Sequence, residues 1–115
     1  MYDPAKLSVK KLPIAGTRTE AVVSRIEEGR LGDFVSAEAL TKWDNPNPDA
    51  KSIRVTATNQ DGVKADKIMS LPSEGNEVHP RSALGSWDRV YGGFPRVGQK
   101  VILLADENGY YRFIV

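Results

Sequence analysis

Residues 82–93 read SALGSWDRVYGG, and this stretch decides the fold. Leu84, Trp87 and Tyr91 recur at three- and four-residue spacing, so their side chains share one face of a helix. The glycine pair that ends the stretch can adopt the left-handed conformation that closes a helix. We therefore predict one short helix over residues 82–91.

The chain before this helix alternates between apolar and polar residues, as half-buried β-strands do. Residues 53–58 form the clearest strand, with apolar side chains at its odd positions and polar ones at its even positions. Asp61-Gly62 then predicts a hairpin turn, because both residue types tolerate a positive φ. Residues 63–71 are the returning strand, and a slip in alternation between Ala65 and Ile68 predicts a bulge.

An earlier strand is predicted over residues 19–28, on which Val23 and Ile26 point to opposite faces. Two nearby glycines interrupt it. The periodic run at residues 34–40 is interpreted as further strand, although Glu38, Ala39 and Leu40 also favour a helix. This part of the chain is therefore either one long, bent strand or two strands.

The remaining elements complete a single domain. Residues 99–105 and 110–115 are expected to be strands, joined by a turn at 106–109, and the proline-rich segment at 43–49 is expected to be a loop. Residues 1–18 are expected to form an arm docked on the domain. A length of 115 residues and a mass of 12.6 kDa fit one domain, residues 1–115.

The order of these elements is three strands, a helix and two strands. This is the order of the OB-fold, a five-stranded Greek-key barrel with one short helix between strands three and four. An SH3-like barrel is the alternative mainly β fold, and it lacks a comparable helix before its last two strands. We therefore predict an OB-fold-like barrel.

The last third of the chain also carries a family resemblance. The residues that carry it are Ser82 to Trp87, Tyr91-Gly92, Pro95, Val97-Gly98, Val101 and Asn108-Gly109-Tyr110. In this region the chain resembles small OB-fold proteins of archaea and viruses, in which a helix ending in Tyr-Gly leads through a Pro-x-x-Gly turn into the last hairpin. The resemblance implies the OB-fold and, by analogy, binding of single-stranded nucleic acid.

The composition argues against most catalytic chemistry. The chain has no cysteine, which excludes disulfides, thiolate metal sites and cysteine nucleophiles, and it has one histidine, His79. Glu27 and Glu28 are adjacent, so on a strand they face opposite ways and cannot act as a pair. Asp106 and Glu107 lie in a tight turn. We therefore expect no catalytic residues, no metal and no cofactor.

Charge and hydropathy bound the possible partners. Sixteen basic and fifteen acidic residues give a net charge of +1, which is too low to hold duplex DNA by charge alone. The longest purely apolar run, residues 101–105, is far too short to span a bilayer. We expect a cytoplasmic protein that does not bind membranes.

An OB-fold binds its ligands on the face of strands two and three, and single strands are held there by aromatic platforms and a basic groove. The predicted nucleic-acid-binding residues are Trp43, Arg54, Thr56, Lys64, Lys67 and Arg112. Trp43 either stacks on a base or caps an open end of the barrel, and the cap is favoured because tryptophans are usually well buried. Phe34 is either a second platform or a core residue, and the core position is favoured.

Two classes of function follow. The first is a non-catalytic module that binds single-stranded DNA, or less readily RNA. The second is a protein-interaction or assembly subunit that uses the barrel face or an exposed strand edge. The near-neutral charge favours the second, whereas the predicted fold and the placement of Trp43, Arg54 and Lys64 favour the first, which is the function we predict.

Overall fold

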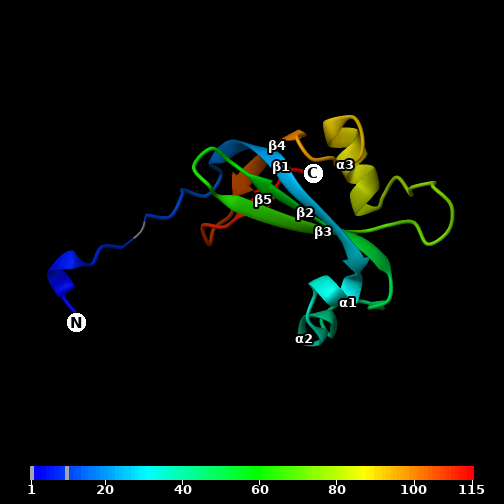
Figure 1. The fold of residues 1–115 in the computed structure, drawn as a ribbon, viewed down its shortest axis with the longest axis horizontal. Coiled ribbons are helices and arrows are strands. Elements are labelled where there is room, and N and C mark those ends of the chain that lie inside the picture. Colours follow the sequence, from blue (N-terminus) through cyan, green and yellow to red (C-terminus); the bar gives the residue numbers. More distant parts are fainter. Residues whose placement is uncertain (1, 10) are drawn as a thin grey trace.

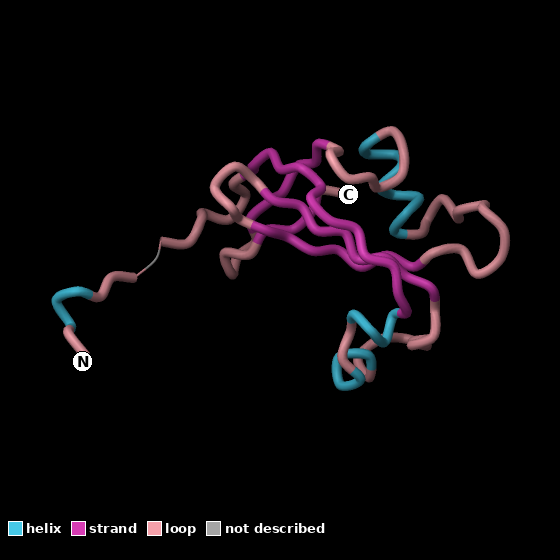
Figure 2. The backbone as a smooth tube through the Cα atoms, in the orientation of Figure 1, coloured by secondary structure: helices cyan, strands magenta, loops and turns pink. Residues whose placement is uncertain are grey.

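The computed structural model describes residues 2–9 and 11–115 and is mainly β. Five antiparallel strands curl into a nearly closed barrel, with a few short helices outside the strand layer (Figures 1 and 2). The elements are η1 (Pro4–Lys6), β1 (Arg18–Arg30), α1 (Leu31–Phe34), α2 (Ala37–Leu40), β2 (Lys51–Thr58), β3 (Lys64–Ser70), α3 (Ala83–Tyr91), β4 (Lys100–Ala105) and β5 (Tyr111–Phe113).

The strands lie in the order β3-β2-β1-β4-β5. The central strand, β1, has 13 residues and pairs with β4 near its start and with β2 along the rest. The two edge strands, β3 and β5, approach each other, which brings the sheet close to closure. Because β1 is long enough to belong to both halves of the sheet, it can curve around the core without a break.

A β-bulge sets which side chains of β1 reach that core. The pairing of β1 with β2 shifts by one residue between Val23 and Arg25, which leaves Ser24 without a partner of its own in the register. An extra residue reverses the alternation of the strand beyond it. As a result Val23 is buried and Ile26 packs against the same core, so the prediction that they face opposite ways is wrong. Neither alternative predicted for residues 19–40 holds, because the region is one strand of 13 residues that ends at Arg30 and is followed by helical turns.

The hairpin of β2 and β3 follows the local sequence signals. Ile53, Val55 and Ala57 are buried, as their alternation predicts, and Gly62 has the positive φ of +82° that the turn requires. The register of β2 with β3 runs continuously from one end of the pair to the other, so the predicted bulge between residues 65 and 68 is wrong.

The segment predicted as further strand at residues 34–40 instead contains helical turns. The carboxylate of Asp33 accepts a hydrogen bond from the backbone N–H of Arg30, which stabilises the start of α1. The hydroxyl of Ser36 accepts one from the N–H of Ala39 and caps α2. These local side-chain caps, together with good helix formers, outweigh the β-propensity of the run. The prediction of a single helix is therefore wrong, because α1, α2 and η1 are present in addition to α3.

Helix α3 begins and ends where its caps dictate. The Ser82 hydroxyl accepts a hydrogen bond from the N–H of Gly85, and Gly92 closes the helix with a φ of +67°. Trp87 has no solvent exposure, and its ring lies 4.7 Å from that of Tyr91 and 5.3 Å from that of Phe113. The apolar face of α3 is therefore packed into the barrel core.

The N-terminal arm is largely in solvent. Residues 2–9 lead away from the barrel in Figure 1, and Val9 is 95% exposed. Leu12 lies against Gly109, and Gly16 donates a backbone hydrogen bond to Ala105. The last part of the arm, residues 12–16, therefore contacts the barrel at the turn between β4 and β5. The docking expected for the whole of residues 1–18 is therefore not seen for residues 2–9, and Met1 and Lys10 lie outside the described residues.

Within residues 2–9 and 11–115, no helix is long and apolar enough to cross a bilayer.

Gly85 should resist substitution although it lies within a helix. A Cβ added there would lie 2.7 Å from the carbonyl oxygen of Pro80 and closer still to that of His79. Alanine normally gains about 1 kcal/mol over glycine in a helix, but the backbone of the preceding loop would have to move. We expect Gly85→Ala to lower the free energy of unfolding by about 1–3 kcal/mol, measured by urea denaturation.

The matched control is Asp88→Ala, at an exposed position of the same helix. It should be neutral or slightly stabilising, because alanine is the better helix former. A Gly85→Ala protein as stable as the wild type would mean that the loop before α3 yields easily.

Candidate functional site

The outward side of β1, β2 and β3 carries a hollow of about 450 Å³. We call this surface the outer face, and it is lined by Ser24, Arg25, Glu27, Arg54, Thr56, Lys64 and Asp66. Arg54 and Thr56 of β2 reach it because the residues that alternate with them, Ile53, Val55 and Ala57, fill the core. Three of the predicted binding residues therefore lie on one surface, namely Arg54, Thr56 and Lys64.

Glu27 binds two arginines at the centre of the outer face. It lies opposite Arg54 in the β1–β2 register, and an Nη2 of Arg54 is 2.7 Å from its Oε2. The Nε of Arg25 is 2.9 Å from its Oε1. The hydrogen bond from Arg54 and the charges of both arginines hold the pKa of Glu27 below its ordinary value, although partial burial acts the other way. Glu27 is therefore an ionised residue that orients two guanidinium groups.

An aromatic ring lies beside this ion-pair cluster. Phe34, at the end of α1, packs over Gly29 of β1, where an added Cβ would come within 2.9 Å of the ring. The guanidinium carbon of Arg54 lies 5.2 Å from the ring centroid, within the range of a cation–π interaction. Phe34 is half-buried at the edge of the outer face, so the prediction that it is a core residue is wrong.

The other end of the outer face is more open. The Thr56 hydroxyl donates a hydrogen bond of 2.6 Å to Asp66, its partner across the β2–β3 pair. Lys64 is exposed, and within the part of the chain that the structure describes it forms no salt bridge. Lys64 can therefore bind an anionic ligand without first losing a partner.

The other three predicted residues lie elsewhere. Lys67 is in register with Val55, a core residue, so it does not share a face with Lys64. Trp43 follows α2 in the loop between β1 and β2 and is 46% exposed, so it does not cap the barrel as a buried plug. Arg112 is on β5, and its Nε lies 3.1 Å from a carboxylate oxygen of Asp106.

Four residues of the outer face were not among the predicted binding residues, namely Ser24, Arg25, Glu27 and Asp66. The places of Arg25 and Glu27 depend on the bulge at Ser24, which shifts the alternation of β1 and is not visible in the local pattern. Asp66 reaches the face through its register with Thr56. Acidic residues able to hold a metal are also scattered: among the described residues no three His, Asp or Glu side chains cluster for that purpose.

Comparisons with protein-family models, with curated proteins and with solved structures gave no match. The function therefore has to be inferred from the fold and from the chemistry of the outer face.

Glu27 should make the stability of the protein depend on pH. Because folding lowers its pKa, the ionised form stabilises the folded state above the ordinary pKa of glutamate, and this stabilisation is lost as the pH falls through the folded value. We expect Glu27→Gln to be less stable than the wild type at pH 7 in urea denaturation. The difference in the free energy of unfolding between the two proteins should decrease below about pH 4 and disappear in stronger acid.

The background variant Arg54→Gln is the control. With the principal partner gone, adding Glu27→Gln should change stability much less than it does in the wild type. A gap that is the same at pH 7 and at pH 2 would show that the lost stability is due to packing, not to charge.

Proposed function

We propose that this protein is a non-catalytic OB-fold module that binds single-stranded nucleic acid on the outer face. The strand order β3-β2-β1-β4-β5, the approach of β3 to β5 and the position of α3 between β3 and β4 support the OB-fold. In that fold the ligand lies across strands two and three, between the β1–β2 and β4–β5 loops. The outer face includes side chains of β2 and β3, and Phe34 of the β1–β2 connection lies beside it, which supports this assignment.

The observation that carries the proposal is the Phe34–Arg54 pair. The half-buried Phe34 ring lies at the edge of the strand face with the guanidinium carbon of Arg54 over it, 5.2 Å from its centroid, so an aromatic group and a positive charge meet at one point. Single-strand binding proteins combine these two features, because every base has a π-face and every nucleotide has a phosphate. Phe34 is the proposed platform, with Arg25 and Lys64 contacting phosphates.

The acidic side chains limit the affinity. The outer face has three basic residues, Arg25, Arg54 and Lys64, and two acidic ones, Glu27 and Asp66, for a net charge of +1. A phosphate must compete with Glu27 for two of the three cations. We therefore expect modest affinity that weakens as salt is raised.

A protein-interaction or assembly role is the second candidate. The observation that favours it is the N-terminal arm, whose apolar side chains are exposed in the structure. This role does not need the outer face.

Removal of the Phe34 ring should weaken binding with little change in its salt dependence. Stacking contributes about 1–3 kcal/mol per base, so Phe34→Ala should raise the Kd by roughly 5- to 150-fold. Fluorescence anisotropy with labelled single-stranded DNA and RNA oligonucleotides, at two salt concentrations, measures both quantities. Phe94→Ala, at a half-exposed aromatic outside the outer face, is the matched control.

Charge variants separate the site from general attraction. Lys64→Ala should flatten the slope of log affinity against log salt by about 0.7 if it removes one phosphate contact. Lys67→Ala also removes one positive charge, three residues along the same strand. Because Lys67 is in register with the core residue Val55, this variant should leave the slope unchanged. The proposal fails if the wild type binds neither DNA nor RNA at low salt, or if both lysine variants behave alike.

A further inference from the structure

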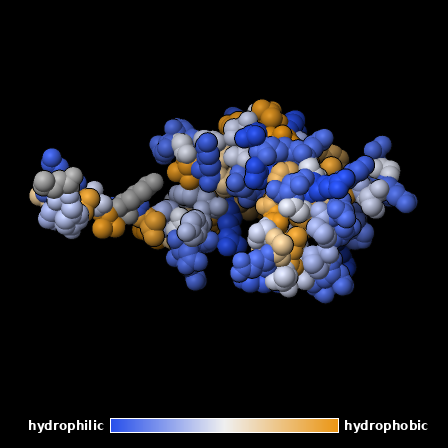
Figure 3. Space-filling view, turned by 60° about the horizontal axis from the view of Figure 1, so that its bottom comes forward, coloured by the Kyte–Doolittle hydropathy of each residue, from blue (hydrophilic) through white to orange (hydrophobic). Residues whose placement is uncertain are grey.

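The N-terminal arm carries apolar side chains that nothing in its own barrel covers. Leu7 is 64% exposed and Val9 is 95% exposed, in a segment that runs from η1 toward the barrel. Hydrophobic atoms are visible along the projecting arm in Figure 3. In an extended chain, residues two apart point the same way, so Leu7 and Val9 form one apolar edge. Such an edge gains stability if it is buried against another surface.

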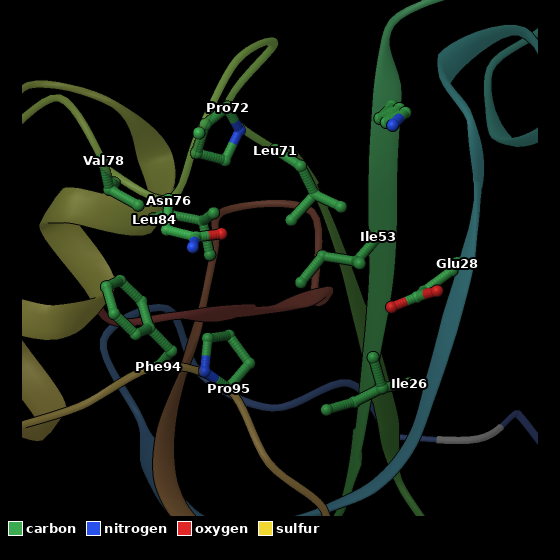
Figure 4. A pocket seen from close by; sticks show the side chains of 12 residues that line it. Ile26, Glu28, Ile53, Leu71, Pro72, Asn76, Val78, Leu84, Phe94 and Pro95 are labelled. Atoms are coloured by element: carbon green, nitrogen blue, oxygen red, sulfur yellow. The ribbon is translucent and has the colours of Figure 1, made fainter.

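An apolar pocket lies on the side of the barrel where α3 packs. It has a volume of about 480 Å³, within the range of pockets that hold small ligands or side chains. In Figure 4, Ile26 and Ile53 project from the strands toward Leu84, Phe94 and Pro95 on and after α3. We call this cavity the α3 pocket. Its apolar lining matches the apolar edge of the arm.

The charges around the two surfaces are also complementary. The lining of the α3 pocket has one acidic and one basic residue, Glu28 and Lys51. The adjoining hollow, which shares Leu71, Pro72 and Val78 with it, adds Glu74 and Glu77. The arm sequence over residues 2–14 contains three lysines and one aspartate. An acidic rim and a basic arm attract each other before the apolar side chains meet.

We propose that the arm of one copy occupies the α3 pocket of a second copy, so that two chains exchange arms. The molecule is 59 Å along its longest axis, and Figure 1 places the arm at one end, with α3 and the loop before it toward the other. The arm therefore points away from its own pocket. Two copies lying side by side in opposite directions bring each arm next to the pocket of the other, and this reciprocal arrangement closes as a dimer.

This inference does not rest on the proposed function. The arm and the α3 pocket do not include any residue of the outer face, so nucleic-acid binding can fail while the exchange holds, and the reverse.

Sedimentation velocity over a range of protein concentrations tests the exchange. The full chain should form dimers, and Leu7→Glu/Val9→Glu should raise the dimer dissociation constant by at least about 100-fold, since each buried Leu or Val contributes more than a factor of ten. Both changes are on the exposed arm, so folding is preserved, which circular dichroism checks. Phe94→Glu, on the pocket rim, should have a similar effect. Val97→Glu, an exposed apolar position outside the pocket, is the matched control and should dimerise normally.

Charge reversal gives a second, independent test. Lys6→Glu/Lys11→Glu and Glu74→Lys/Glu77→Lys should each weaken self-association, because arm and rim then carry like charges. Mixing the two variants should restore dimers that contain one chain of each, since both arm–pocket contacts in the mixed pair are again attractive. A wild-type chain that stays monomeric near millimolar concentration, arm variants that dimerise as the wild type does, or a mixture that forms no mixed dimers would each overturn the exchange.

Discussion

The burial of Trp87 is the interaction on which the rest of the structure depends. Its ring packs against Tyr91 and Phe113, and its indole N–H donates a hydrogen bond of 3.2 Å to the buried Gln99 side chain. This single residue joins α3 to the last strand and to the turn that leads into β4. With the helix fixed against the core, the two faces of β2 differ: one fills the barrel, and the other contributes Arg54 and Thr56 to the outer face.

On the outer face, ion pairs hold the charged side chains in place, and the net charge is small. Glu27 uses both carboxylate oxygens on Arg25 and Arg54, which fixes the two guanidinium groups and reduces their pull on distant anions. Phe34 covers one end of the same cluster. A surface of this kind favours a ligand that offers both a flat apolar group and a negative charge in the right places, and it disfavours ligands that offer charge alone. The proposed binding of single-stranded nucleic acid rests on this combination.

The sequence predicts the parts of the fold that depend on local signals. The alternation of β2 and the caps of α3 follow from neighbouring residues, and both elements are found where the pattern indicates. The candidate site is harder to predict from the sequence, because it depends on the bulge at Ser24 and on the register between strands that are far apart in the chain. Lys67 is the clearest case: on the sequence it belongs with Lys64, but the register with Val55 places it with the core-facing residues. The helical turns after β1 could have been recognised from Ser36 as a capping residue before good helix formers.

The central claim is that single-stranded nucleic acid binds on the outer face. The most direct test is to follow backbone amide NMR shifts during titration with a short single-stranded oligonucleotide at low salt. The account predicts that the largest changes occur at Arg25, Phe34, Arg54 and Lys64, with those of α3 nearly unchanged. Changes confined to α3 or the arm, or no changes at saturating oligonucleotide, would contradict it.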